Sequence, residues 1–161
     1  MNRRTTLVSI ALLSLVACGF PQASFAQTSP LMGSWKLDLT KSKYTSGVAP
    51  RSQTNTYEQD GQNIKATTQS INAQGNATTT VFLHIYDGQP HPTTGSPVFD
   101  ASTYLRLNGN TIIFSRSKAG KLVSTGTNLV SPDGKTLTVT TTGILDANGL
   151  AGTNTAVYDK Q

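Results

Sequence analysis

The sequence predicts an all-β domain, an antiparallel up-and-down meander closed into a barrel of about 8–10 strands. Along most of the chain, apolar and polar residues alternate with the period of two that is typical of half-buried strands. Turn sequences that contain glycine recur between these segments. A meander of this length has to bury one face and pair its edges, and closure into a barrel achieves both. The alternative is a two-sheet sandwich, which usually needs longer crossing connections.

The first 26 residues are expected to be an export leader and not part of the fold. Arg3 and Arg4 precede an apolar run, residues 7–16, that is too short to span a bilayer as a helix. This pattern of a basic start and a short apolar run is typical of secretory signals. We therefore expect the protein to be exported.

Two cleavage sites compete at the end of this leader. Residues 24–26 form a small-x-small site, which predicts a soluble periplasmic or secreted product beginning at Gln27. Residues 15–18 resemble a bacterial lipobox, which predicts a leader of residues 1–17, lipidation of Cys18 and an outer-membrane lipoprotein. We prefer the soluble product and keep the lipoprotein as the alternative. A lipid on Cys18 is the single membrane attachment that we expect.

Charge and cysteine content exclude several classes of protein. The formal net charge is +5, and loss of Arg3 and Arg4 with the leader lowers it by two. The remaining cations are dispersed along the chain, so we expect no nucleic-acid partner. Cys18 is the only cysteine, which excludes an intramolecular disulfide.

The mature chain is expected to begin with a linker over residues 27–32 and to continue as one barrel domain over residues 33–161. The first strand is predicted for residues 33–40, where Trp35, Leu37 and Leu39 share one face. Gly47 and Pro50 predict a loop over residues 41–50. Trp35 is the only tryptophan, and we expect it to plug one end of the barrel.

Eight further strands follow, most of them separated by tight turns. Asp60-Gly61 and Asn108-Gly109 are hairpin turns in which positive φ angles cost little. Residues 131–134, Ser-Pro-Asp-Gly, form a β-turn sequence. The strands are predicted for residues 52–59, 63–71, 78–86, 98–107, 111–116, 121–130, 135–142 and 150–159.

Residues 87–97 form the longest segment for which we predict no regular structure. Three prolines and two glycines interrupt it. His91 lies within it and is a possible loop contact for a partner. On the strand just before this segment, Val81, Leu83 and Ile85 share one face, and Phe82, His84 and Tyr86 share the other. We expect His84 to be a hydrogen-bonded structural residue and not a catalytic base.

Several motifs resemble known families. Residues 33–37, Gly-Ser-Trp-Lys-Leu, resemble the G-x-W opening strand of lipocalins and fatty-acid-binding proteins, and residues 156–160 resemble the closing strand of the latter group. The chain is also similar to uncharacterised exported bacterial proteins with a lipocalin-like (calycin) β-barrel. The shared segments are Lys41–Tyr44, Tyr86–Gly88, Thr94–Pro97 and the Tyr158–Gln161 end. The similarity spans Gly33 to Gln161. It implies a lipocalin-like barrel and brings no established activity with it.

The sequence also departs from these families. Fatty-acid-binding proteins insert a helix pair after the first strand, where this chain has only residues 41–51. Lipocalins place an arginine from a late strand over the tryptophan, and the last strand here has none. By this resemblance Arg106, Arg116 or Lys121 would have to take that place.

The resulting functional hypothesis is a non-catalytic binding protein of the cell envelope with a small apolar or amphipathic ligand in the barrel. The candidate lining residues share an apolar face by alternation. They are Leu37, Leu39, Ile64, Leu83, Ile85, Phe99, Leu105, Phe114, Leu137 and Tyr158.

Two other functions stay open at this stage. Side chains alone can fill a barrel of about eight strands. In that case the chain would be a loop-presenting scaffold or inhibitor whose residues 87–97 contact an envelope protein or glycan. An unrecognised enzyme is the third choice, resting on His84, His91 and Asp100. We expect no cofactor and no metal, because His91 with the carboxylates of Asp87 and Asp100 does not form a recognised ligand spacing.

Expression in an exporting host should remove the leader. Mass spectrometry of the envelope fraction is expected to find a chain that begins at Gln27, or a lipidated chain that begins at Cys18. An intact chain that begins at Met1 and stays in the cytosol would contradict both alternatives.

Overall fold

The computed structural model describes residues 29–45 and 49–161. The predicted leader and Cys18 lie outside these residues. Within them, no helix has the length and apolar character needed to cross a bilayer. The chain forms ten strands: β1 (Gly33–Tyr44), β2 (Ser52–Asp60), β3 (Asn63–Ile71), β4 (Ala77–His84), β5 (His91–Thr94), β6 (Ala101–Arg106), β7 (Thr111–Lys118), β8 (Lys121–Val130), β9 (Thr136–Ile144) and β10 (Ala151–Lys160).

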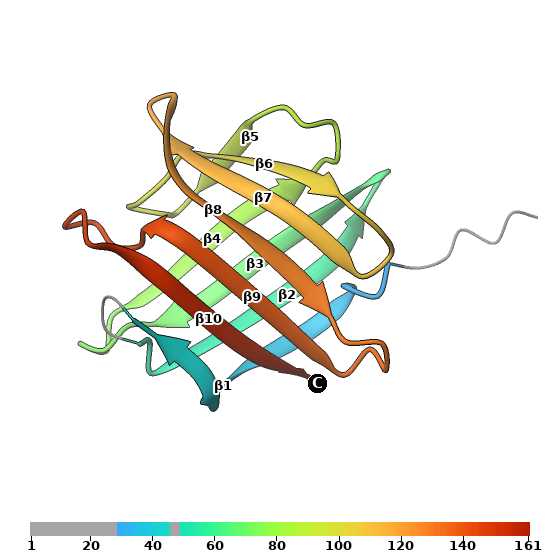
Figure 1. The fold of residues 1–161 in the computed structure, drawn as a ribbon, viewed down its shortest axis with the longest axis horizontal. Helices are drawn as coiled ribbons and strands as arrows, with labels where there is room; N and C mark the ends of the chain where they lie inside the picture. Colours follow the sequence, from blue (N-terminus) through green and yellow to red (C-terminus); the bar gives the residue numbers. More distant parts are fainter. Residues whose placement is uncertain (1–28, 46–48) are drawn as a thin grey trace, which may run out of the picture.

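The strands form one closed antiparallel barrel, which confirms the predicted fold class. Each strand pairs with its neighbours in sequence, and β1 closes the barrel by pairing with both β2 and β10. In Figure 1, β7 to β10 run across the front, and β2 to β4 cross behind them at a steep angle. The predicted strand positions are close to the observed ones except at β1, β4, β5 and β6.

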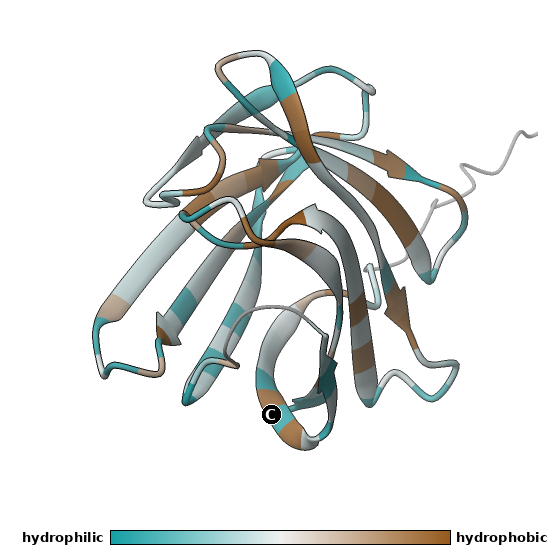
Figure 2. Cartoon of the chain, turned by 60° about the vertical axis from the view of Figure 1, so that its left-hand side comes forward, coloured by the Kyte–Doolittle hydropathy of each residue, from teal (hydrophilic) through white to brown (hydrophobic). Residues whose placement is uncertain are grey.

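The strand pattern separates a buried interior from a polar outer surface, and hydrophobic and hydrophilic segments alternate along the strands in Figure 2. On β2, Asn55 and Tyr57 are buried, whereas Thr54, Thr56 and Glu58 are not. The hydrophobic core collects such inward residues from most of the strands. Its members are Leu31, Trp35, Leu37, Tyr57, Ile64, Ala66, Phe82, Tyr104, Ile112, Phe114, Val130, Leu137, Ala156 and Tyr158.

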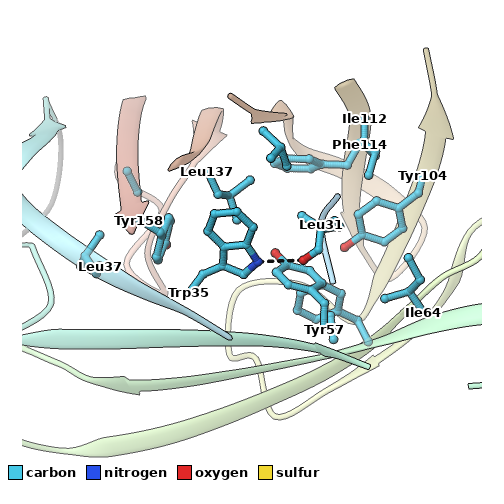
Figure 3. Packing of buried hydrophobic residues seen from close by; sticks show 14 residues of the cluster. Leu31, Trp35, Leu37, Tyr57, Ile64, Tyr104, Ile112, Phe114, Leu137 and Tyr158 are labelled. Atoms are coloured by element: carbon cyan, nitrogen blue, oxygen red, sulfur yellow. Dashed lines mark hydrogen bonds between the residues drawn. The ribbon is translucent and has the colours of Figure 1, made fainter. Parts of the chain in front are cut away.

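Trp35 fills one end of the barrel and is completely buried (Figure 3). Its indole Nε1 donates a hydrogen bond to the Leu31 carbonyl at 2.7 Å. Leu31 is only 1% exposed. Residues 31–32 therefore belong to the core and its rim, and the predicted linker over 27–32 is wrong at this end. The two buried residues hold each other in place, because the buried indole N–H needs an acceptor.

The cation over the tryptophan comes from the last strand. Lys160 Nζ lies 4.9 Å from the centre of the Trp35 ring. The three residues suggested by resemblance are not needed there. Two of them stack on other rings: Arg106 on Tyr86, and Arg116 on Phe114. Lys160 can take this place because it lies at the end of the closing strand, opposite Trp35 in the β1–β10 ladder.

Strand β1 is longer than predicted and contains a bulge. Its pairing with β10 shifts between Asp38 and Lys43. Ser42 bridges the irregular stretch: its hydroxyl donates to the Asp38 carbonyl at 2.6 Å, and the Val157 amide donates to Ser42 Oγ at 2.9 Å. A side chain thus replaces a missing ladder bond, which lets the strand continue where a loop was expected.

The segment predicted to lack regular structure contains β5. This short strand has two paired residues on each side, with β4 and with β6. Gly95, which ends β5 with φ +81°, lies so close to β4 that a Cβ there would be 1.9 Å from the Thr79 carbonyl oxygen. Prolines predicted a loop, but Pro92 is accommodated because β5 makes so few ladder bonds.

Replacing Trp35 by alanine should destabilise the fold strongly. Loss of a large buried ring and of the Leu31 hydrogen bond is expected to lower the free energy of unfolding by about 3–5 kcal/mol. Chemical denaturation followed by circular dichroism measures this. As a control, Leu39→Ala removes a 43% exposed side chain from the same strand, and its effect should stay below about 0.5 kcal/mol. Equal effects of the two substitutions, or a native tryptophan emission maximum typical of water, would contradict the plug.

Candidate functional site: the polar half of the barrel interior

The barrel interior is divided into two halves along its axis. We call the end that holds Trp35 the plugged end, and the opposite end, where the turns 72–76, 119–120 and 145–150 lie, the polar end. Near the plugged end the inward residues are mainly aromatic or aliphatic (Figure 3). Toward the polar end the same strands turn hydrophilic residues inward. The buried ones include Asn55, Ser102, Ser124, Asn128 and Thr141.

A small cavity of about 50 Å³ lies where the two halves meet. Its walls combine amide and hydroxyl groups from the polar half with rings from the aromatic half. The lining residues are Gln53, Asn55, Tyr57, Thr68, Phe82, Tyr104, Phe114, Arg116, Asn128 and Val139. A cavity needs about 10–15 Å³ on this measure to hold one water, so this volume has room for a few water molecules.

Arg116 supplies the one charged side chain among the residues that line this cavity. Its guanidinium lies between two rings, 4.5 Å from the centre of Phe99 and 4.6 Å from that of Phe114. Arg116 Nε is buried without a hydrogen-bond partner. In the described part of the chain, no carboxylate forms an ion pair with Arg116. Arg116 is half-buried, and among the described side chains its guanidinium contacts aromatic faces and no anion.

The effect of this cation extends through the interior. Burial raises the pKa of the Tyr104 hydroxyl to about 12, and the positive charge of Arg116 partly opposes this rise. Burial likewise raises the pKa of Tyr57 and of Tyr158, and Arg116 opposes both shifts. Arg116 thus favours negative charge in its surroundings, yet all three phenols stay neutral at physiological pH because desolvation dominates.

Amide side chains beside Arg116 offer hydrogen-bond donors. The Tyr158 hydroxyl donates to the Gln53 side-chain oxygen at 3.1 Å, and the Thr68 hydroxyl donates to the Asn55 side-chain oxygen at 2.7 Å. The Asn55 side chain also donates to the Tyr158 hydroxyl and so lowers the pKa of that phenol, which makes the NH₂ group of Gln53 the amide donor that can turn to a ligand. Together with the guanidinium, this NH₂ group suits a negatively charged oxygen.

A glycine on β8 makes room for one of the cavity rings. A Cβ at Gly126 would lie 2.4 Å from Phe114 Cζ and 2.1 Å from the Thr140 carbonyl oxygen. The Phe114 ring can therefore approach β8 this closely only because residue 126 has no side chain. This contact fixes the ring that stacks on Arg116 and closes one wall of the cavity.

His84 lies next to the cavity in a stack of aromatic rings and is completely buried. Its ring is 3.9 Å from that of Tyr104, nearly parallel, and 5.5 Å from that of Phe82. Its Nε2 atom has no hydrogen-bond partner. Burial, together with the positive charges of Arg116 and Arg106, lowers the pKa of His84 to about 3. The imidazole is therefore neutral and acts as a packed ring.

The ten predicted lining residues occupy three kinds of position. Five of them are buried in the core, namely Leu37, Ile64, Phe114, Leu137 and Tyr158. Among these five, only Phe114 borders the cavity. Phe99 lies on the β5–β6 connection and covers Arg116. Leu39 and Leu105 are 43% and 44% exposed and belong to the outer surface. Leu83 alternates with the buried Phe82 and His84, so it also faces outward, and Ile85 follows β4 in the connection to β5.

These corrections have physical reasons. Both faces of β4 are apolar, so alternation alone does not decide between Leu83 and Phe82, and the aromatic ring packs inward with Tyr104 at 6.0 Å. Leu39 lies within the irregular part of β1, where the alternation relative to β10 is interrupted. On β6, Ser102 and Tyr104 point inward, which places Leu105 outside.

The polar cavity residues were not predicted from the sequence, because the lining was expected to be apolar. A signal was nevertheless present on β2 and β7. Gln53 and Asn55 stand at the same inward positions as Tyr57, and Arg116 stands two residues after the inward Phe114. Polar residues that continue an inward apolar series indicate a polar interior.

His91 is paired on the surface. Its Nε2 lies 2.9 Å from an Asp87 carboxylate oxygen, and in the described residues its ring bonds to no other residue. Arrangements of three or more His, Cys, Asp or Glu able to hold a metal ion are absent from residues 29–45 and 49–161. The pair helps to order the β4–β5 connection, since Asp87 also accepts the Gln89 amide.

Comparison with known proteins relates the chain to other barrels by shape. No protein-family model matches the sequence, and curated proteins give no significant match. A solved structure described as the REP1-NXSQ fatty acid transporter aligns with 81% of this chain and 96% of its own, with a TM-score of 0.56 and 18% identity. The structure of zebrafish ileal bile acid-binding protein complexed with cholic acid aligns with 83% of this chain and 100% of its own, with a TM-score of 0.48 and 15% identity. The first of these similarities supports a lipocalin-like barrel.

The buried state of His84 predicts an acid-sensitive fold. An unfolded histidine titrates near pH 6.5, whereas folded His84 binds a proton only near pH 3. The unfolded state therefore binds more protons as the pH falls below 6.5, and stability decreases. Between pH 7 and pH 5 the free energy of unfolding should fall by about 2 kcal/mol. Denaturant melts over this range measure the effect.

The test variant is His84→Phe, which removes the buried imidazole and should abolish most of this decrease between pH 7 and pH 5. Asp38 and Asp133, whose pKa values are lowered by hydrogen bonds, act only below about pH 4 and do not interfere. Imidazole signals of His84 that titrate near pH 6.5 in the native protein would contradict the account.

Proposed function

We propose that this protein is a non-catalytic binding protein that holds a small amphipathic ligand in the polar half of its barrel, with the negatively charged group of the ligand at Arg116. The observation that carries the proposal is the half-buried Arg116 guanidinium, which lines the cavity, has no carboxylate partner among the described residues and keeps its Nε buried without an acceptor. Keeping a cation partly buried without a carboxylate is unfavourable for stability. A ligand anion would supply the missing partner.

The surroundings of Arg116 support binding rather than catalysis. The neighbouring groups are amides, hydroxyls and aromatic rings, which position a ligand but do not transfer protons near pH 7. His84 is neutral with a pKa of about 3, too low for a general base at that pH. The shape similarity to other barrels fits this proposal and does not define the ligand.

The scaffold alternative is less favoured by the structure of residues 87–97. These residues contribute β5, whose pairing with β4 and β6 completes the barrel wall. The close contact between Gly95 and β4 ties the segment to the barrel. A contact surface that a partner recognises independently of the barrel would be expected to protrude from it.

Our proposal places the binding protein in the cell envelope, because we expect it to be exported. The predicted leader supports a periplasmic or secreted carrier, or a lipoprotein attached through Cys18. In either case the ligand would be a molecule of the envelope or of the medium.

Substitution of Arg116 by methionine should weaken ligand binding and leave the fold intact. Methionine keeps much of the side-chain volume but removes the charge. Loss of a charge-assisted contact is expected to reduce the affinity for an amphipathic carboxylate about ten- to a hundredfold. Displacement of an environment-sensitive fluorescent probe measures the affinity. Without ligand, the variant should be at least as stable as the original, because an uncompensated cation has been removed.

The matched control is Arg51→Met, which changes the net charge equally. Arg51 is exposed near the same end of the barrel, and its Nε donates to the Ala73 carbonyl. Equal losses of affinity in the two variants would indicate general electrostatic attraction and contradict a specific site. Strong destabilisation by Arg116→Met alone would indicate a structural role instead.

A further inference from the structure

We infer that the ligand is a compact carboxylate whose charged head enters the cavity beside Arg116, and that the barrel excludes long acyl chains. This inference rests on the proposed function and names its ligand class. Two features of the interior carry it: the lack of free space in the plugged half and the single positive charge at the cavity.

Side chains already fill the plugged half of the barrel. Trp35 and Leu31 close its end, and Tyr104 stacks on His84 at 3.9 Å. Phe82 extends the stack, 6.0 Å from Tyr104 and 5.5 Å from His84. A chain of methylene groups could pass between these rings only if several of them left their packed positions, which is costly in a close-packed interior.

The cavity itself is too small for an extended apolar ligand. Its volume of about 50 Å³ is far below the roughly 300–1,000 Å³ of pockets that enclose drug-sized molecules. It matches the size of a charged head group. The rest of such a ligand would have to lie toward the polar end, beside Phe99, where the lining side chains are hydrophilic.

The charge of the cavity favours a monoanion. Arg116 is the one cation among the lining residues, and amides of Gln53, Asn55 and Asn128 surround it. A carboxylate balances one positive charge and accepts two parallel N–H donors of a guanidinium. A phosphate dianion would leave one negative charge unbalanced at this half-buried site.

One substitution should enlarge the cavity, and it therefore tests directly whether the cavity limits the length of the ligand. Phe114 stacks on Arg116 and is held against Gly126. Phe114→Ala should enlarge the cavity beside Tyr104, which also lines it. Phe99→Ala removes the other ring on Arg116, but at the polar end, so it should not deepen the cavity.

In the experiment, the mature protein is titrated by calorimetry with straight-chain carboxylates from acetate to palmitate. NMR follows the Arg116 Nε–H signal in the same titrations. The affinity of the unmodified protein should stop rising after the first few methylene groups. Phe114→Ala should bind the longer acids more tightly than the unmodified protein, and Phe99→Ala should keep the original length limit. If Phe114→Ala does not fold, the series on the unmodified protein decides.

Three results would contradict the inference in distinguishable ways. Affinity that rises about fourfold for each methylene up to palmitate would show that a long chain enters, and it would leave the proposed function standing. Tighter binding of inorganic phosphate than of acetate would overturn the carboxylate. No binding of any acid, with no change at Arg116, would overturn the proposed function itself.

Discussion

The fold depends on the pairing of β1 with both β2 and β10, which leaves no exposed edge among the described strands. Closure fixes which residues of each strand point inward, because a shift by one residue would reverse every side chain. It also brings the first and last strands together, so that Lys160 stacks over Trp35 and Lys41 bonds to Asp159. The bulge in β1 adapts this strand to its two partners without breaking the ring.

Within this closed ring, the interior serves two purposes at once. The aromatic and aliphatic half supplies the hydrophobic stabilisation that a domain without a disulfide requires. The polar half contributes less, and it keeps Arg116 without a carboxylate partner. Features that lower stability without a structural reason are often functional, since a sequence selected for stability alone would remove them. This contrast is the physical basis for placing the ligand at Arg116.

The sequence was sufficient for the fold class and for most strands, because alternation and tight turns are local signals. It was less informative wherever local rules conflicted with tertiary contacts. The prolines of residues 87–97 concealed β5, which exists because β4 and β6 need a partner between them. On β4, both faces are apolar, and only the stacking of Phe82 and His84 on Tyr104 decides the inward face. Phe114 was predicted to line the interior, but the polar cavity residues were missed because an apolar lining was expected. Arg116 becomes informative only once its surroundings are known.

In this account Arg116 binds the anionic group of the ligand, and the packed side chains of the plugged half limit how far the ligand can enter. The most direct measurement is a crystal structure of the protein with a bound short-chain carboxylate. The account predicts carboxylate oxygens about 2.7–2.9 Å from the Arg116 guanidinium nitrogens, with the plugged half unchanged and the remainder of the ligand toward the polar end. A carboxylate bound elsewhere, or an acyl chain threaded between Trp35 and Tyr104, would contradict it.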